Sequence, residues 1–271
     1  MSTLLLQHLI DDAALFPPGD APMVSAVGGH RAVKVGPLGW LVGRFLCPAS
    51  RLGELRAELR AEDTFALGLI GDSGAGGLPA ALAEVAGDPR LMLTAVELAA
   101  PASGDLVGSV REVLDALPAG VRCYVEIPRL PQWRAALAVV AAAGRGAKLR
   151  TGGTQASAFP TEREVAEFLV ACTAANVPFK CTAGLHNAVR HTDATTGFAH
   201  HGFLNLALAV CAAVRGEDPE PVLAQQDGAA LAAVVRGLDE DTVVRSRALF
   251  GGFGSCSIGE PAGDLLKLDL L

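Results

Sequence analysis

Two lysines stand in similar local sequences and are the residues of this chain best suited to covalent chemistry. Lys148 begins the string KLRTGG, and Lys180 begins the string KCTAGL. The chain carries most of its positive charge on arginine, with 18 arginines against four lysines. Arginine stays protonated, whereas a buried lysine can lose its proton and attack a carbonyl carbon as a free amine. The pattern therefore indicates Schiff-base chemistry.

The protonation of the two lysines depends on what surrounds them. Two ammonium groups a few ångströms apart repel each other, which lowers at least one pKa and leaves a free amine near neutral pH. The alternative is that each lysine is paired inside the fold with a carboxylate, Glu97 or Glu126. Both possibilities stay open at the level of sequence.

The elements that must position these residues alternate along the chain. Short apolar runs predict strands at Trp40–Cys47, Phe65–Gly71, Leu91–Leu98, Val121–Ile127, Ala147–Thr151, Val177–Thr182 and Ala248–Ser257. Stretches rich in Ala and Leu predict helices at Ser50–Ala61, Leu78–Ala86, Asp105–Ala116, Pro131–Ala143, Thr161–Ala175 and Asp227–Arg236. Strand–helix units of about 25–30 residues favour parallel pairing with right-handed crossovers. We expect one α/β domain over residues 1–271, a (β/α)8 barrel with a closed parallel sheet.

In such a barrel the carboxyl ends of the strands meet at one mouth, where catalytic side chains lie. Five polar residues stand near the ends of the predicted strands: Glu97, Glu126, Lys148, Arg150 and Lys180. Cys47 also ends a strand, and we expect it to line the pocket.

Seven motifs, in the same order along most of the chain, resemble the deoxyribose-phosphate aldolase family of class I aldolases. They are LIDDAALFPP from position 9, FLCP from 45, AVEL from 95, YVEI from 124, KLRTGG from 148, FKCTAGL from 179 and FGSCS from 253. The resemblance implies that Lys148 forms the Schiff base, that Lys180 is the second lysine of the site and that Glu97 relays protons. It also implies that the FGSCS segment binds phosphate.

The chain departs from the family pattern in ways that bear on the substrate. Glu97 stands in place of an aspartate, Arg150 in place of a serine, and the family's C-terminal tyrosine is missing. The stretch after Lys180 is longer than in the family, with an enlarged segment at about 187–247. Acetaldehyde and a sugar phosphate are therefore not implied as substrates.

Several residues are candidates for binding an anionic substrate. The planar fork of Arg150 suits a carboxylate or a phosphate. Ser255 and Ser257 lie in the glycine-rich segment GGFGSCS, which offers backbone N–H and hydroxyl donors to a phosphate or is an ordinary closing turn. Gly184 allows close approach of a ligand. His186, in the expected loop after the Lys180 strand, suits an acid, a base or an anion ligand.

Our first hypothesis is a lyase that forms a Schiff base on a small, anionic carbonyl substrate and needs no cofactor. A second is a metal-assisted lyase or isomerase in which Glu97, Glu126 and histidines from His186, His191, His200 and His201 hold the ion. No HxH or HExxH spacing supports that site, so we predict no metal. A third is a non-catalytic barrel that binds a small anion.

Composition excludes several other classes. The chain has 271 residues, is 51% hydrophobic and has a net charge of −7 without long runs of like charge, so we expect neither a nucleic-acid nor a membrane partner. Its beginning lacks the basic region of a signal peptide. The six scattered cysteines form no CxxC pair and are expected to be reduced thiols of a cytoplasmic protein. We also expect a homodimer.

Overall fold

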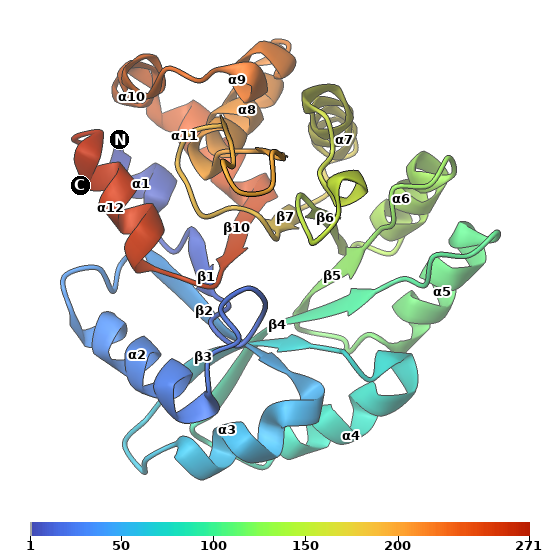
Figure 1. The fold of residues 1–271 in the computed structure, drawn as a ribbon. Helices are drawn as coiled ribbons and strands as arrows, with labels where there is room; N and C mark the ends of the chain where they lie inside the picture. The colour runs from blue at the N-terminus through green and yellow to red at the C-terminus, as the bar shows by residue number, and fades with distance from the viewer. Residues whose placement is uncertain (1) are drawn as a thin grey trace.

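The computed structural model describes residues 2–271 and contains a closed barrel of eight parallel strands, which confirms the predicted fold class. The strands follow the order β1-β10-β7-β6-β5-β4-β3-β2 around the barrel, and β2 closes on β1 (Figure 1). Their bounds are β1 Ile10–Asp12, β2 Val42–Pro48, β3 Phe65–Ile70, β4 Leu91–Ala99, β5 Arg122–Glu126, β6 Gly146–Arg150, β7 Phe179–Thr182 and β10 Phe250–Ser255. All seven predicted strands are present.

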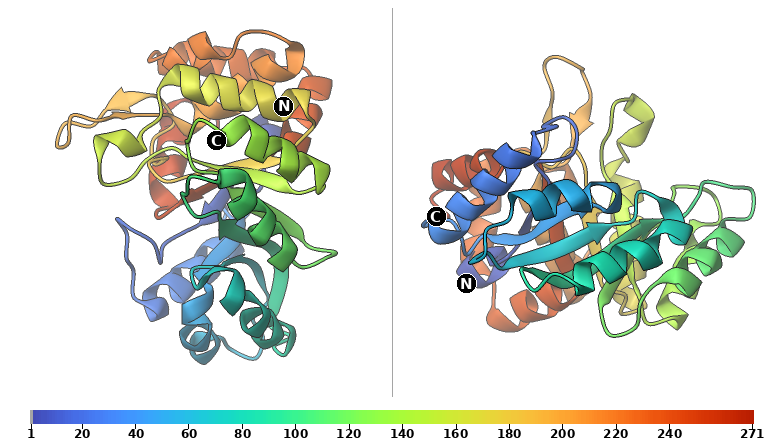
Figure 2. Two further views of the ribbon diagram at one scale, coloured as in Figure 1. Left: turned by 90° about the vertical axis from the view of Figure 1, so that its right-hand side faces the viewer. Right: turned by 90° about the horizontal axis from the view of Figure 1, so that it is seen from below.

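Helices surround the barrel and connect successive strands (Figures 1 and 2). The six that sequence predicts are α3 Leu52–Glu58, α4 Gly74–Ala86, α5 Leu106–Ala116, α6 Trp133–Ala142, α7 Glu162–Ala174 and α10 Gly228–Gly237. The others are α1 Ser2–Leu6, α2 Met23–Val35, α8 Phe203–Arg215, α9 Glu220–Ala224, α11 Glu240–Leu249 and α12 Gly259–Lys267, with short 3-10 turns η1 Ala49–Arg51 and η2 Ala156–Ala158.

The enlarged segment at 187–247 contributes no strand to the barrel. It consists of a small antiparallel hairpin, β8 His191–Thr192 with β9 Ala199–His200, followed by the helices α8 to α11. The hairpin projects from the body of the molecule in Figure 2. Every residue of α8 from Phe203 to Val214 is buried, because α7, α9, α10 and α11 all pack against it. This extra helical layer explains the length of the segment.

Side chains alternate between the barrel lumen and the layer under the helices, and this alternation selects the site residues. On β7, Phe179 and Cys181 belong to the apolar layer, whereas Lys180 points into the lumen. On β6, Ala147 and Leu149 face the helices, whereas Lys148 lies on the lumen face. Apolar neighbours on both sides of each lysine therefore fix its direction.

One strand of the barrel, β1, is not predicted from the sequence. β1 has three residues, all buried, and two of them are Asp11 and Asp12. Acidic residues disfavour strands in sequence patterns, so this stretch lacks the signal of a buried strand. Among residues 2–271, no helix combines the length and the apolar character needed to cross a membrane.

Candidate functional site

The deepest part of the candidate site is an ion-pair cluster around Lys180 in the barrel lumen. Its ammonium group lies 2.5 Å from Asp11 Oδ2 and also donates a hydrogen bond to Glu97 Oε1. Asp11 in turn lies 3.1 Å from a guanidinium nitrogen of Arg44 on β2. The Lys180 side chain is fully buried, so these carboxylates replace the water that an ammonium group requires.

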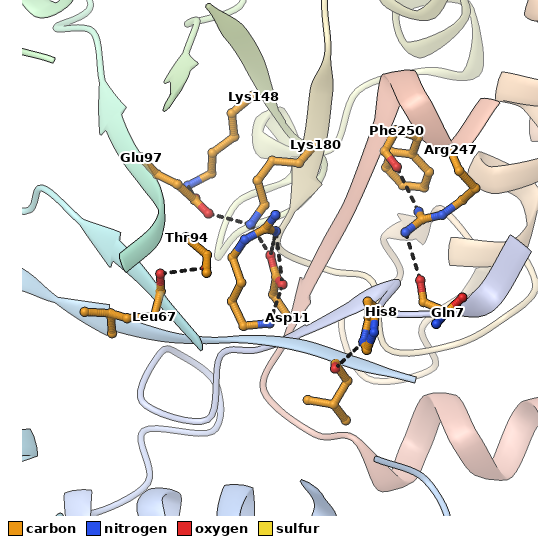
Figure 3. A network of polar contacts seen from close by, with 12 residues as sticks. Gln7, His8, Asp11, Leu67, Thr94, Glu97, Lys148, Lys180, Arg247 and Phe250 are labelled. Carbon is orange, nitrogen blue, oxygen red and sulfur yellow. Dashed lines mark hydrogen bonds and ion pairs between the residues drawn. The ribbon is translucent and has the colours of Figure 1, made fainter. Parts of the chain in front are cut away.

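Glu97 joins Lys180 to the second lysine. Its Oε2 atom lies 2.8 Å from Lys148 Nζ, while its Oε1 atom accepts from Lys180 (Figure 3). The contact with Lys148 is an ion pair without the alignment of a hydrogen bond. The carboxylate lies between the two ammonium groups, which are carried by register partners on β6 and β7. The sequence prediction that Lys148, Lys180 and Glu97 lie together therefore agrees with their placement.

Toward the mouth, Glu126 continues the same series of contacts. Glu126 Oε2 lies 3.0 Å from Lys148 Nζ, and Glu126 Oε1 accepts a hydrogen bond of 2.8 Å from Arg150 Nε. Glu126 and Lys148 are register partners on β5 and β6, and Arg150 follows two residues later on the same face of β6. Arg150 therefore pairs with Glu126 at the rim of the barrel.

Together these residues form an unbroken line of alternating charge from the barrel interior to its mouth. In order they are Arg44, Asp11, Lys180, Glu97, Lys148, Glu126 and Arg150. From Lys180 toward the mouth, side-chain exposure of the cations rises from 0% at Lys180 to 8% at Lys148 and 51% at Arg150, while Arg44 at the other end is 17% exposed. Lys148 is therefore the lysine that a molecule entering the mouth meets first.

The electrostatics of the lysines differ from the prediction that repulsion lowers a pKa. Burial lowers the pKa of Lys180, but Asp11 and Glu97 outweigh it and hold that pKa above its ordinary value. Burial and the nearby Lys180 lower the pKa of Lys148, but Glu97 and Glu126 reverse the balance and raise it. That prediction was wrong because each ammonium group contacts two carboxylates. The alternative of lysines paired with Glu97 and Glu126 describes the resting state.

The carboxylates respond in the opposite direction. Burial alone raises the pKa of Glu97, yet the ammonium groups of Lys148 and Lys180 lower it to about 2. The pKa of Glu126 is also lowered, because Lys148 and Arg150 outweigh its burial. These shifts in pKa favour the charged forms of Glu97, Glu126, Lys148 and Lys180 in the resting site.

Two members of this series were not singled out from the sequence. Asp11 lies on the strand that escaped prediction, and Arg44 lies in the middle of the predicted strand Trp40–Cys47. A charged residue inside each apolar run could have identified them. Such a residue is buried only together with an oppositely charged partner, so it indicates an ion pair inside the fold.

Cys47 does not line the pocket as expected. On β2 the lumen face carries Arg44, and Cys47 is an odd number of residues away, so its thiol lies in the apolar layer between the sheet and the helices. Burial there raises its pKa to about 12. The prediction was wrong because it identified the end of the strand but not the side of the sheet on which the Cys47 side chain lies.

His186 lies in the loop after β7, where it contacts the region following β10. Its Nδ1 atom lies 2.9 Å from Glu260 Oε2, and Cys256 Sγ lies 3.7 Å from the same ring nitrogen. The Cys256 and Glu260 contacts raise the pKa of His186 to about 9 against the effect of partial burial. His186 is thus tied to the start of α12 rather than to Glu97 or Glu126.

The other clustered histidines have separate environments. His191 and His200 face each other across the β8–β9 hairpin, with ring centroids 5.3 Å apart. His201 is buried and hydrogen bonds through Nε2 to the carbonyl oxygen of Pro160. Among residues 2–271, no three His, Cys, Asp or Glu side chains are grouped to hold a metal ion. The histidines therefore do not form the predicted alternative site with Glu97 and Glu126.

The remaining predicted binding residues lie at or just beyond the strand ends, with Ser255 as the last residue of β10. Gly184 has a φ of +74°, and the position of a Cβ there is 3.3 Å from the Cα of Gly152, so the two loops pack closely. Ser255 Oγ donates a hydrogen bond of 2.7 Å to the carbonyl oxygen of Ser257, and Ser257 Oγ accepts from the backbone N–H of Glu260. These serines are engaged in the turn before α12, and their anion-binding role stays a prediction.

Comparison of the chain with protein-family models, with curated proteins and with solved structures finds no match in any of the three. The structure shows an eight-stranded parallel barrel with a charged lumen at the carboxyl ends of its strands. Proteins with this fold are commonly enzymes.

Proposed function

We propose that this protein is a lyase of the class I aldolase type, which forms a Schiff base between Lys148 and a small, anionic carbonyl substrate. One observation carries the proposal: Lys148 reaches the barrel mouth while sharing the carboxylate of Glu97 with the buried Lys180. A nucleophilic amine needs a neighbouring group that accepts and returns its proton. Glu97, 2.8 Å away, is placed for that role.

The assignment of Lys148 rather than Lys180 as nucleophile rests on access. Lys180 is fully buried and held by Asp11 and Glu97, whereas the Lys148 side chain is 8% exposed. Lys180 is then a positioning residue, because its ammonium group holds Glu97 ionised and directed between the two lysines.

The reaction begins when Lys148 loses its proton, with Glu97 or Glu126 as acceptor. The amine nitrogen adds to the carbonyl carbon, and one proton of that nitrogen moves to the former carbonyl oxygen to give a neutral carbinolamine. Return of the first proton from the carboxyl group to that hydroxyl releases water and leaves a protonated imine on Lys148. The bond between the α and β carbons then breaks: its electron pair forms the enamine double bond while nitrogen accepts the C=N π pair, and the β-hydroxyl gives its proton to a carboxylate as it becomes the departing carbonyl group. Protonation of the enamine carbon and addition of water to the resulting iminium ion release the second product and free Lys148.

Reductive trapping tests the proposal. We expect borohydride, with a panel of small aldehydes, ketones and 2-oxo acids, to fix a stable adduct on Lys148 that intact mass and peptide mapping detect. The Lys148→Met variant should lose it, and Lys267→Met, which changes an exposed lysine in an ion pair with Asp264, should retain it. Absence of an adduct on either Lys148 or Lys180 across the panel would contradict the proposal and favour a barrel that only binds anions.

A further inference from the structure

The line of alternating charge in the lumen ends in a cation that is only partly paired. It contains four cations, Arg44, Lys180, Lys148 and Arg150, but three carboxylates, Asp11, Glu97 and Glu126. A further cation, Arg247, lies beyond the inner end and donates to the backbone oxygens of Gln7 and Phe250. Within the line the cations exceed the carboxylates by one, and Arg150 at the mouth is the most exposed of these cations, at 51% against 17% for Arg44.

Arg150 is the group that can receive a negative charge from a ligand. Within residues 2–271 its guanidinium donates through Nε to Glu126, and Nη1 and Nη2 have no protein partner. Its side chain is 51% exposed, so these two nitrogens are open to a ligand. Two parallel N–H donors of a guanidinium match the two oxygens of a carboxylate.

The position of Arg150 restricts how far the anionic group lies from the reacting carbonyl. Arg150 follows Lys148 by two residues on one strand face, a separation of about 6.6 Å along the strand. The single carboxylate of Glu126 already bridges the two side chains, at 3.0 Å from Lys148 Nζ and 2.8 Å from Arg150 Nε. An anion bound at Arg150 therefore lies beside the carbonyl that Lys148 attacks, rather than several bonds away at the end of a sugar phosphate.

We propose that the Schiff-base substrate is a 2-oxo carboxylate, with its carboxylate bound to Arg150 and its C2 carbonyl facing Lys148. The inference rests on the proposed function. A 2-oxo carboxylate joins the two groups through one carbon–carbon bond, which suits the short gap bridged by Glu126.

The test compares trapping of pyruvate with trapping of its neutral methyl ester, in wild type and in Arg150→Gln. The ester keeps the 2-oxo carbonyl and loses the charge. For each compound the trapping rate in the variant is divided by the rate in wild type, so the different intrinsic reactivities of pyruvate and its ester cancel. We expect Arg150→Gln to slow adduct formation with pyruvate by about tenfold or more, the effect of losing a charged hydrogen bond. Trapping of methyl pyruvate should stay within about twofold, because that ester has no charge for Arg150 to bind.

The matched control is Arg122→Gln, which removes the same charge from an exposed arginine at the opposite end of the neighbouring strand β5. It should leave both rates unchanged. Suppose that methyl pyruvate or acetaldehyde forms an adduct on Lys148, and that Arg150→Gln changes the trapping rates of pyruvate and its ester by the same factor. This result would overturn the proposal of a 2-oxo carboxylate substrate, whereas the proposed Schiff-base function would still hold. Failure of every carbonyl compound to form an adduct would overturn both.

Discussion

Lys148 and Lys180 are register partners on neighbouring parallel strands, and their ammonium groups contact different oxygens of the same carboxylate, that of Glu97. Two buried cations that contact the same carboxylate would repel each other if that anion did not lie between them. Glu97 supplies that anion and is itself buried, with 1% of its side chain exposed. Glu97 therefore contributes both to the stability of the lumen and to the protonation of the nucleophile.

The substitution Glu97→Gln should destabilise the fold by about 3–5 kcal/mol, the usual cost of removing one partner from a buried ion pair. It preserves the size of the side chain while leaving Lys148 and Lys180 with less compensating charge. Urea unfolding at pH 7, followed by circular dichroism, measures the free energy of unfolding.

The control for this substitution is Glu167→Gln, which removes the same charge from an exposed pair with Arg134. Exposed pairs contribute little, so its urea midpoint should stay close to that of wild type. Equal midpoints for Glu97→Gln and Glu167→Gln would show that the buried contacts in the lumen do not stabilise the fold.

The stability difference between wild type and Glu97→Gln should depend on pH on the acid side. The pKa of Glu97 is about 2 in the folded protein, below the value of about 4.3 for a free glutamate. A carboxyl group with a lowered folded-state pKa stabilises the fold fully above its unfolded value, and this contribution decreases as pH falls toward the folded value. The difference should therefore be constant from pH 6 to 8 and shrink from about pH 5 to pH 3.

Urea midpoints of both proteins across that range provide the measurement. His186, whose pKa is raised to about 9, adds a separate dependence that is present below its unfolded pKa and lost as pH rises through 9. Because it occurs in both proteins, it cancels in the difference. A difference that grows as the pH falls would contradict the ion-pair role of Glu97.

The substitution Glu126→Gln should make Lys148 more reactive near neutral pH. Glu126 Oε2 lies 3.0 Å from Lys148 Nζ and helps to raise the pKa of that amine, so its removal lowers the pKa and increases the fraction of free amine. In wild type, reductive trapping of methyl pyruvate should accelerate as pH rises from 7 to 9. In Glu126→Gln the same profile should shift to lower pH.

Peptide-resolved rates of adduct formation with cyanoborohydride measure this shift. Glu167→Gln again serves as the control and should keep the wild-type profile, because its charge is outside the lumen. A Glu126→Gln profile displaced to higher pH would mean that Glu126 acts mainly as the proton acceptor rather than as a charge that stabilises the ammonium form.

Much of this arrangement follows from sequence patterns, for a clear physical reason. Apolar runs bounded by helical stretches indicate the strands, and a polar residue within a run, such as Lys180 between Phe179 and Cys181, indicates the lumen face. The meeting of strand ends at one mouth then brings Glu97, Glu126, Lys148 and Arg150 together. These relations depend on local periodicity and on the topology of the barrel.

What sequence did not predict depends on contacts between distant segments. The sign of the lysine pKa shifts follows from which carboxylates reach each ammonium group, and Asp11 is 169 residues from Lys180 along the chain. The strand that carries Asp11 has three residues, too few for a periodic pattern. The side of the sheet that Cys47 faces follows from the period of two on β2, counted from the charged residue Arg44.

The thiols provide a direct test of how β2 faces. Of the six free cysteines, Cys256 is partly exposed and the other five, including Cys47, are buried. Burial raises the pKa of Cys47 to about 12, and the thiolate is the reactive form. We expect a disulfide reagent at pH 8 to modify Cys256 alone in the native protein and all six thiols in urea. Cys256→Ser should abolish the native reaction and Cys47→Ser should leave it unchanged, whereas native labelling of Cys47 would mean that its side chain opens to the barrel mouth.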